Sequence, residues 1–333
     1  MNSMALLRRQ QRVEATCAWQ RTPEIRDFAP CEEAHRELKQ LCDAPDLAVR
    51  EALLRTPSAN SPPACHALMQ QVADELRKGV GIALLSLPWT DSISDDQHKA
   101  IAATMFRCLG PIVDQKISGA PVYAVRDKGR PLGPGVRRSV TRDEQSFHTD
   151  GGWLVHAPEL VALYCVRQSA NGGENQIASL ARAHNTLLRE APHLLEALYQ
   201  PLPWDRQREH AAGERQYAMQ SIFTMTAQDG FYGRYYEDYV LKGAKLADKP
   251  LSPLTLEALT ALEQTIAEDQ YKVKLKLEAG QMLLVNNRRV THARSSFAHE
   301  PDLQRRRLML RLWTRLEGNT SVEGNLVSVQ ARD

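Results

Sequence analysis

The sequence predicts an α+β protein with a mainly β core of the jelly-roll or barrel type and helices around it. Apolar residues alternate with a period of two at 271–285 and 308–316, as they do in half-buried strands. Strands dominate the later half of the chain, without the regular succession of one helix per strand that a parallel sheet requires. Antiparallel strands that close into a barrel or a double-layered jelly roll fit this pattern better.

The chain is expected to divide near residue 63. Its 333 residues exceed the roughly 100–200 of one typical domain. Residues 24–55 have the apolar spacing of helices, interrupted at Pro45, and the segment 56–63 (TPSANSPP) has the composition of a linker. We therefore predict an N-terminal helical arm and linker over 1–63, and a β-core domain over 64–333.

Within the second part, helices are expected at 65–78 and 95–109, because each has an apolar face and ends at a glycine. The apolar run 81–87 between them predicts a buried strand that stops at Pro88. A further strand at 159–166 and a helix at 181–199 follow from the same patterns.

Residues 119–147 differ from their surroundings in being rich in glycine, proline and charge. Long segments without core residues inside a compact protein are usually functional or disordered. Because this segment comes directly before the most informative motif, we predict that it forms a lid over an active site. The alternative is an ordinary mobile surface loop.

Charge and composition exclude several classes of protein. The 42 basic and 40 acidic residues nearly cancel, which argues against nucleic acid as a partner. No stretch approaches the roughly 18 consecutive apolar residues of a membrane helix, and the N-terminal residues lack the apolar core of a signal peptide. Six scattered cysteines without a CxxC pair indicate reduced thiols. These features predict a cytoplasmic protein without membrane contacts.

His148 and Asp150 form a His-x-Asp pair that an extended strand would direct to one side. Such a pair is frequent by chance, so a metal site needs a third ligand from elsewhere. His292 is the candidate, because it lies far downstream and just beyond an alternating strand. Two histidines and one carboxylate are the facial triad of non-haem iron(II) oxygenases.

Residues 305–313 add a possible anion site. Arg307 and Arg311 share one face of the predicted strand with a methionine and Trp313, and three leucines occupy the other face. This pattern fits a wall between a packed layer and an anion-binding cavity, because the guanidinium fork matches a carboxylate. A solvated basic edge of a sheet is the alternative for these residues.

Taken together, the motifs resemble those of the iron(II)/2-oxoglutarate oxygenases of the taurine dioxygenase/clavaminate synthase-like superfamily. The resemblance extends from about residue 68 to about 316 and leaves out the first 60 residues. Four short motifs in the same order carry it: His148-x-Asp150, Gly172-Gly173-Glu174-Asn175, Asn287-Arg288-x-x-x-His292-x-Arg294 and Arg307-x-x-x-Arg311.

The resemblance implies a double-stranded β-helix, or jelly roll, with iron(II) at its open end. His148, Asp150 and His292 would bind the metal, and 2-oxoglutarate and O2 would be the cosubstrates. The expected activity is hydroxylation of an unactivated C–H bond of a small molecule, with release of succinate and CO2. An amino acid or an intermediate of specialised metabolism is the expected substrate class.

Further site residues follow from the same resemblance. Arg307 would bind the distal carboxylate of 2-oxoglutarate. Asn175 stands where the superfamily usually has a threonine or serine that contacts the cosubstrate, and its amide can donate the same hydrogen bond. Arg311 would contact either 2-oxoglutarate or an anionic group of the substrate. Trp153, three residues after the carboxylate ligand, is a candidate for the cavity wall, with ordinary core packing as the alternative.

The substrate contacts are less determined by the sequence. Glu144 is a candidate for binding the ammonium group of an amino acid whose carboxylate binds Arg311; the alternative is a solvated charge. Three arginines of the predicted lid, Arg126, Arg137 and Arg138, are the alternative contacts and would bind an anionic substrate.

Four other interpretations remain open at this point. A desaturase or a cyclase would use the same residues and cosubstrates. A zinc hydrolase could use the same three ligands, although it has no need of Arg307. A non-catalytic binding protein on the same fold is the fourth. The arm over 1–63 is also a candidate surface for forming a homo-oligomer.

Overall fold

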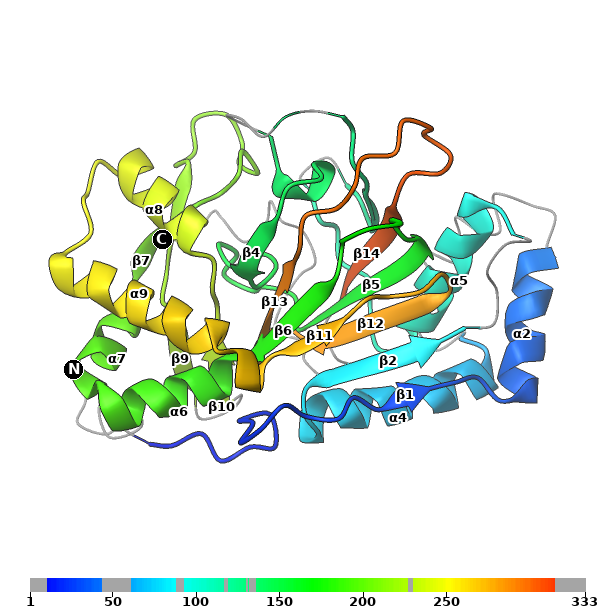
Figure 1. Cartoon of the computed structure of the whole chain (residues 1–333), viewed down its shortest axis with the longest axis horizontal. Coiled ribbons are helices and arrows are strands. Elements are labelled where there is room, and N and C mark those ends of the chain that lie inside the picture. The colour runs from blue at the N-terminus through cyan, green and yellow to red at the C-terminus, as the bar shows by residue number, and fades with distance from the viewer. Residues whose placement is uncertain are drawn as a thin grey trace.

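The structure, a computed structural model, describes residues 11–43, 61–87, 93–116, 119–129, 131, 136–226 and 230–314. Two sheets lie at its centre, with one group of helices (α6 to α9) on the left of Figure 1 and another (α2, α4 and α5) on the right and below. The chain is thus a mixed α/β protein with strands concentrated in its core, as predicted.

The larger sheet has six strands in the order β1, β2, β12, β5, β14 and β3, and all neighbours are antiparallel except β1 and β2. Their bounds are β1 Asp27–Phe28, β2 Ile82–Ser86, β12 Gln281–Asn286, β5 Leu160–Arg167, β14 Leu308–Thr314 and β3 Val122–Val125. The strands expected at 81–87, 159–166 and 308–316 are therefore present.

The smaller sheet has four antiparallel strands in the order β11, β6, β13 and β4. Their bounds are β11 Val273–Leu275, β6 Asn175–Ser179, β13 Val290–Arg294 and β4 Gln145–His148. Two hairpins complete the strands, namely β7 Leu202–Asp205 with β8 Tyr217–Gln220 and β9 Phe223–Thr226 with β10 Gly230–Gly233. The alternating segment 271–285 thus supplies one strand to each main sheet.

The helices are α2 Glu32–Asp43, α4 Pro63–Lys78, α5 Asp95–Arg107, α6 Leu180–Glu190, α7 Pro192–Leu198, α8 Glu237–Leu246 and α9 Pro253–Ala267, with short 3-10 turns at Arg138–Val140 and Asp269–Tyr271. The single helix expected at 181–199 is two helices. Pro192 has no backbone N–H to continue α6, and it occupies the first turn of α7 instead. The expected helix at 95–109 begins at a capping box, in which the Ser94 hydroxyl accepts a hydrogen bond from the Gln97 backbone.

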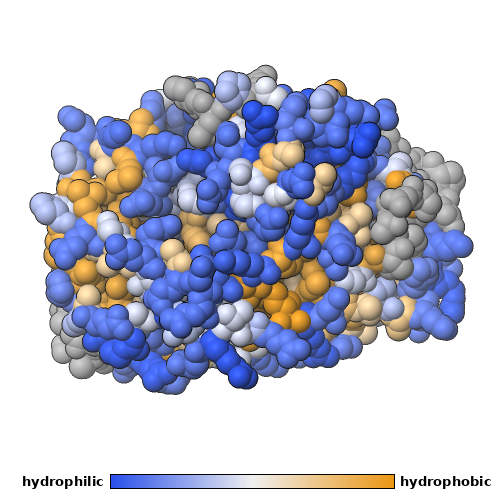
Figure 2. Space-filling view, viewed as in Figure 1, coloured by the Kyte–Doolittle hydropathy of each residue, from blue (hydrophilic) through white to orange (hydrophobic). Residues whose placement is uncertain are grey.

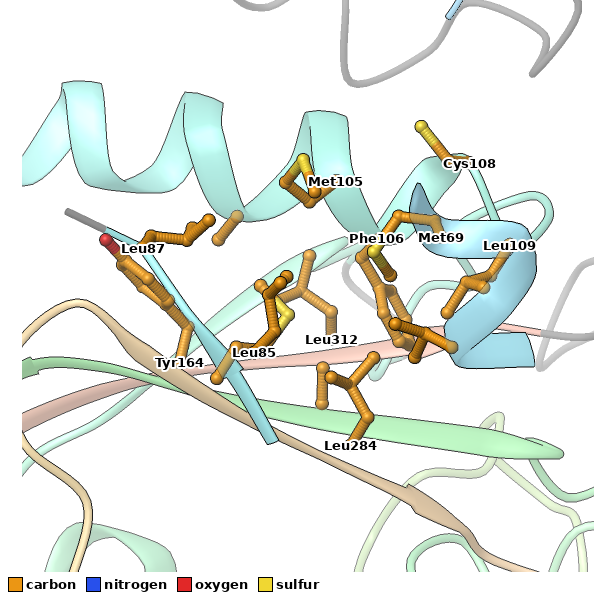
Figure 3. Packing of buried hydrophobic residues seen from close by; sticks show 14 of the residues in the cluster. Met69, Leu85, Leu87, Met105, Phe106, Cys108, Leu109, Tyr164, Leu284 and Leu312 are labelled. Carbon is orange, nitrogen blue, oxygen red and sulfur yellow. The ribbon is translucent and has the colours of Figure 1, made fainter. Parts of the chain in front are cut away.

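Helices α4 and α5 cover one face of the six-stranded sheet. Figure 3 shows Leu85, Leu284 and Leu312 directed from three strands toward Met105 and Phe106 of α5. The alternation of β14 matches the prediction, because its leucines lie in this layer whereas its other apolar residues face the smaller sheet. The inner face of the large sheet is therefore free to build a site between the sheets.

The described part of the expected N-terminal arm packs along this body. Strand β1 pairs with β2, and α2 contacts α4 and α5. The Trp19 indole donates a hydrogen bond to the Val80 carbonyl oxygen, at 3.0 Å. The rest of the predicted arm, residues 1–10 and 44–60, lies outside the described residues, so the boundary at 63 stays a prediction. No helix in the described part of the chain is long and apolar enough to cross a membrane.

The segment predicted to be a lid contains regular structure. Strand β3 lies at the edge of the large sheet against β14, and the segment ends in β4. Residues 130 and 132–135 of this segment lie outside the described residues. Figure 2 shows a mostly hydrophilic face, on which apolar residues gather at the left, over α8 and α9, and again below the centre.

A buried histidine in the helical layer should make the protein less stable in mild acid. His184 of α6 is fully buried against Phe223 and Phe231, and its Nε2 lies 2.9 Å from the Tyr199 hydroxyl. Burial lowers its pKa from 6.5 to about 4. The unfolded chain takes up this proton below about pH 6.5, so the stability from His184 is present above that pH and is lost as the pH falls toward 4. The expected loss is about 3 kcal/mol.

Urea unfolding between pH 4 and 7.5 measures this effect. The His184→Gln variant should lose part of the pH dependence, whereas the exposed-site control His193→Gln should keep it. Parallel pH profiles for wild type and His184→Gln would contradict the prediction.

Candidate active site

The predicted metal ligands come together between the sheets. One candidate ligand atom from each of His148, Asp150 and His292 lies within 4.8 Å of the others, and all three residues are buried. His148 ends β4 and is the direct cross-strand partner of His292 on β13. Asp150 follows β4 by two residues, and its Oδ1 lies 3.8 Å from Nε2 of His148. The strand pairing thus explains how ligands far apart in sequence meet.

Hydrogen bonds orient two of these residues. Nδ1 of His148 lies 2.9 Å from the Ser146 carbonyl oxygen, which makes Nε2 the acceptor nitrogen, and the side-chain amide nitrogen of Gln145 lies 2.9 Å from that Nε2. Asn287 holds the backbone of Asp150 from both sides, because its Oδ1 accepts from the Asp150 N–H at 2.8 Å and its Nδ2 donates to the Asp150 carbonyl at 2.9 Å. Such outer contacts fix the geometry of metal ligands.

Strand β14 contributes two donors to the Asp150 carboxylate. Nη1 of Arg311 donates to Oδ1 at 2.8 Å, and the Trp313 indole donates to Oδ2 at 2.9 Å. Burial is the largest single influence and raises the pKa of this carboxyl. Arg311, the two histidines and the Trp313 hydrogen bond together outweigh it, so the pKa is lowered. Asp150 is therefore a carboxylate anion at neutral pH, the form that binds a metal.

Both histidines are neutral at the same pH. Burial lowers the pKa of His148 to about 3 and also lowers that of His292. Nδ1 of His292 is buried and has no hydrogen-bond partner among the described residues. The two neutral imidazoles and the carboxylate are a donor set suited to a divalent transition metal.

A second group of residues surrounds Arg307. Its Nε donates to Oε1 of Gln168 at 3.0 Å, and its guanidinium lies over the Phe297 ring beside that of Arg294. Arg307 is 4% exposed, and no carboxylate of the described residues forms an ion pair with it. Burial lowers its pKa to about 9, with a further contribution from the charge of Arg294. Two adjacent buried cations favour an anionic ligand here.

The Gly172-Gly173 turn makes room for this arginine. Gly173 has φ +79, and a Cβ there would lie 2.8 Å from Oγ of Ser169 and 3.1 Å from Nε of Arg307. Asn175 follows on β6 opposite Arg294, and its buried Nδ2 has no hydrogen-bond partner in the described part of the chain. A buried amide donor without a partner is suited to a ligand oxygen.

A small cavity of about 30 Å³ touches His148 and Asp150. Its wall includes Trp153, Tyr236 and Tyr239. The Tyr236 ring lies 5.1 Å from that of His148, and Tyr239 lies between Tyr236 and Trp153. Three aromatic side chains thus line the cavity next to His148 and Asp150.

Some of the candidate substrate residues line this cavity, and others lie away from it. Trp153 lines the cavity and also packs in the apolar cluster of the helical layer, so both of its interpretations stay open, and Arg311 reaches Asp150. Arg137 and Arg138 line the same cavity. Two residues lie elsewhere: Arg126 binds Asp95 at 3.2 Å, and Glu144 is exposed and lines neither this cavity nor the larger one beside it.

Several residues at the site were not found from the sequence. Gln168 and Gln115 hold Arg307 and Arg311, and an isolated glutamine gives no signal. Tyr236 and Tyr239 of the α8 region were also missed. Their spacing of three, continued at Lys242, is a helical period that could have revealed one lining face.

Comparison with known proteins decides the family. Residues 59–313 match the model of the family described as taurine catabolism dioxygenase TauD, TfdA family. The chain belongs to this family. It is an iron(II)- and 2-oxoglutarate-dependent dioxygenase, and the resemblance seen in the motifs is confirmed.

Two curated proteins are similar to this chain in sequence. FR-33289 synthase of Streptomyces rubellomurinus is 30% identical over 262 residues, which are 75% of this chain and 73% of that protein. A uridine-5'-phosphate dioxygenase of an Amycolatopsis species is 25% identical over 234 residues, 68% of this chain and 82% of that protein.

Solved structures share the fold. Asparagine oxygenase in complex with Fe(II), hydroxyasparagine and succinate has a TM-score of 0.63 at 18% identity, covering 86% of this chain and 93% of that one. The non-haem iron oxygenase OrfP in complex with Fe and α-ketoglutaric acid has a TM-score of 0.63 at 13% identity, covering 87% and 94%.

Proposed function

We propose that this dioxygenase hydroxylates an unactivated C–H bond of a small molecule, with conversion of 2-oxoglutarate to succinate and CO2. The observation that carries the proposal is the buried His148–Asp150–His292 donor set, together with a separate buried arginine, Arg307, that forms no ion pair with a carboxylate of the described residues. A catalytic zinc site would use the three ligands but not Arg307.

The residues present fit both iron(II) and 2-oxoglutarate. His148, Asp150 and His292 would hold iron(II), since two neutral imidazoles and a carboxylate leave coordination positions open for oxygen chemistry. With iron(II) and 2-oxoglutarate bound, O2 would be the oxidant, and it would take two electrons from the decarboxylation of 2-oxoglutarate and two from the C–H bond. Arg307 would hold the distal carboxylate of 2-oxoglutarate, with Arg294 adding charge and Asn175 offering its amide donor.

The remaining side chains of the site hold Asp150 in position and shield the reacting carbon from water. Trp313 and Asn287 keep the Asp150 carboxylate and backbone in place, and Arg311 neutralises its charge. Trp153, Tyr236 and Tyr239 would exclude water from the reacting carbon. The two facing sheets support a double-stranded β-helix as the scaffold, with the triad at one end.

The substrate class is proposed as an amino acid or a related intermediate of specialised metabolism. Asparagine oxygenase, a protein of the same fold, was solved with hydroxyasparagine. Two relatives are dioxygenases of uridine-5'-phosphate, which supports an anionic substrate.

Removal and replacement of the metal tests the proposal. Protein stripped with a chelator should form no succinate from 2-oxoglutarate, and iron(II) in the presence of O2 should restore slow, substrate-independent turnover. Zinc should not restore it, because zinc has no redox chemistry. Succinate is measured by mass spectrometry. Failure to bind either iron(II) or 2-oxoglutarate would overturn the proposal, as would a hydrolytic activity that only zinc restores.

A further inference from the structure

A much larger cavity adjoins the one at the triad. It measures about 670 Å³, within the range of pockets that enclose drug-sized ligands. Four residues, Arg137, Arg138, Tyr236 and Tyr239, line both cavities, so the two are neighbours along a shared wall. The rest of the outer cavity is formed by the β7–β8 hairpin and by α8. A free amino acid would fill only part of it.

One face of helix α8 lines this cavity along its length. Tyr236, Tyr239, Lys242 and Leu246 all line it, at spacings of three and four residues that keep them on one face. The Tyr236 ring lies against His148. At 1.5 Å per residue, the backbone of Lys242 lies about 9 Å along the helix axis from that of Tyr236. Its ammonium lies 6.0 Å from the centroid of the Tyr239 ring, which lines both cavities. Lys242 therefore holds its charge beside the wall that the two cavities share.

The near end of the outer cavity is electrostatically balanced. Arg137 forms a short ion pair with Glu209, and Arg138 pairs with Asp238 at 3.4 Å. The Asp205 carboxylate accepts hydrogen bonds from the backbone and the side chain of Gln207. These contacts occupy both carboxylates that line the cavity, Asp205 and Asp238.

Two exposed residues add positive charge to the outer cavity. Arg208 and Lys242 line it, and within the described ranges neither forms an ion pair with a carboxylate. His210 also lines it, with Nδ1 at 3.1 Å from the Ala211 carbonyl oxygen. Two cations that line a ligand-sized cavity without a carboxylate partner among the described residues favour an anion there.

The backbone that carries Arg208 is strained. Gln207 and Arg208 have φ values of 54° and 62°, a left-handed conformation that residues other than glycine seldom adopt, and least often twice in succession. The turn is held by Asp205 at its start and by the Arg206–Glu214 ion pair, at 2.8 Å, beneath it. Strain of this kind persists where surrounding structure enforces it and is concentrated at binding sites.

We propose that the outer cavity binds a phosphoryl or phosphonyl group of the substrate, with Arg208 and Lys242 as its contacts. A phosphate monoester carries close to two negative charges at neutral pH, which matches two unpaired cations better than a carboxylate or a sulfonate does. The carbon to be oxidised would lie near the triad, on the inner side of the wall that the two cavities share. This inference rests on the proposed function and narrows its substrate class.

Calorimetry with four matched probes tests it. Protein loaded with iron(II) and 2-oxoglutarate under nitrogen is titrated with phenyl phosphate, phenylphosphonate, benzenesulfonate and benzoate. The first two should bind at least about 10-fold more tightly than the others, and higher salt should weaken them. A preference for phenyl phosphate would indicate a substrate with a phosphate ester, and a preference for phenylphosphonate would indicate a phosphonate.

Variants locate the site. Arg208→Ala and Lys242→Ala should each weaken phenyl phosphate binding about 10-fold. The matched controls Arg215→Ala and Lys245→Ala remove exposed cations of the same hairpin and helix that do not line the cavity, and should bind as wild type does. Equal affinity for all four probes, or unchanged affinity in the Arg208→Ala/Lys242→Ala double variant, would overturn the inference. Failure of the loading step itself would instead overturn the proposed function.

Discussion

Asp150→Ala is expected to abolish iron binding and to lower succinate formation more than about 100-fold. Outer contacts of a metal ligand already contribute 10- to 100-fold to affinity or activity, and this change removes the ligand itself. It also removes the anion that Arg311 and Trp313 contact in the buried site. Iron affinity by anaerobic titration and succinate formation by mass spectrometry measure the two effects.

The same variant should fold less stably, because Arg311 is left as a buried cation without its carboxylate. Breaking a buried pair on one side costs about 3–5 kcal/mol, whereas replacing both partners by apolar residues is often neutral. Asp150→Ala combined with Arg311→Met should therefore regain stability in urea but not iron binding. If the double variant bound iron as wild type does, Asp150 would not be a ligand.

The sequence was sufficient to predict the triad because its signal is local and geometric. A His-x-Asp pair at a strand end and a histidine after a second strand require only that the strands pair. The structure shows this pairing directly between His148 and His292. The alternation of β14 likewise predicted which of its side chains face the site.

The alternating pattern did not predict which groups these side chains contact in the folded protein. Alternation places Arg307 and Arg311 on one face, but it does not show that one ends against Phe297 and the other at Asp150. Strand β1 has two residues, too few for an alternating pattern, so its pairing with β2 was not foreseen. The outer cavity is built from the β7–β8 hairpin and α8, which carry no metal-binding motif.

Arg307→Ala should lower the affinity for 2-oxoglutarate by a factor of about 30 to several thousand. This range corresponds to the roughly 2–5 kcal/mol lost when one partner of a buried charge pair is truncated. Arg307→Lys should fall in between, because an ammonium keeps the charge but loses the planar fork. Titration of 2-oxoglutarate into the iron-loaded protein under nitrogen measures this affinity.

Replacing Arg307 should not lower the stability of the protein without 2-oxoglutarate, although it lowers the affinity for 2-oxoglutarate. Arg307 is desolvated without a carboxylate partner in the described part of the chain, and its lowered pKa expresses this cost. Replacing it by an apolar residue of similar length, Arg307→Met, should therefore leave stability unchanged or raise it, while 2-oxoglutarate binding is lost. The exposed neighbour Arg305→Ala is the control for removing one positive charge and should alter neither property.

These two measurements separate a binding residue from a structural one. If Arg307 were structural and held β14 in place, the Arg307→Ala and Arg307→Met variants would both be less stable than wild type. Their 2-oxoglutarate affinity would then fall only as the folded fraction falls. A binding arginine shows opposite signs, because the charge that costs stability without the ligand is compensated when the dicarboxylate binds. Loss of stability in Arg307→Met, with normal 2-oxoglutarate affinity in the remaining folded protein, would remove Arg307 from the cosubstrate site.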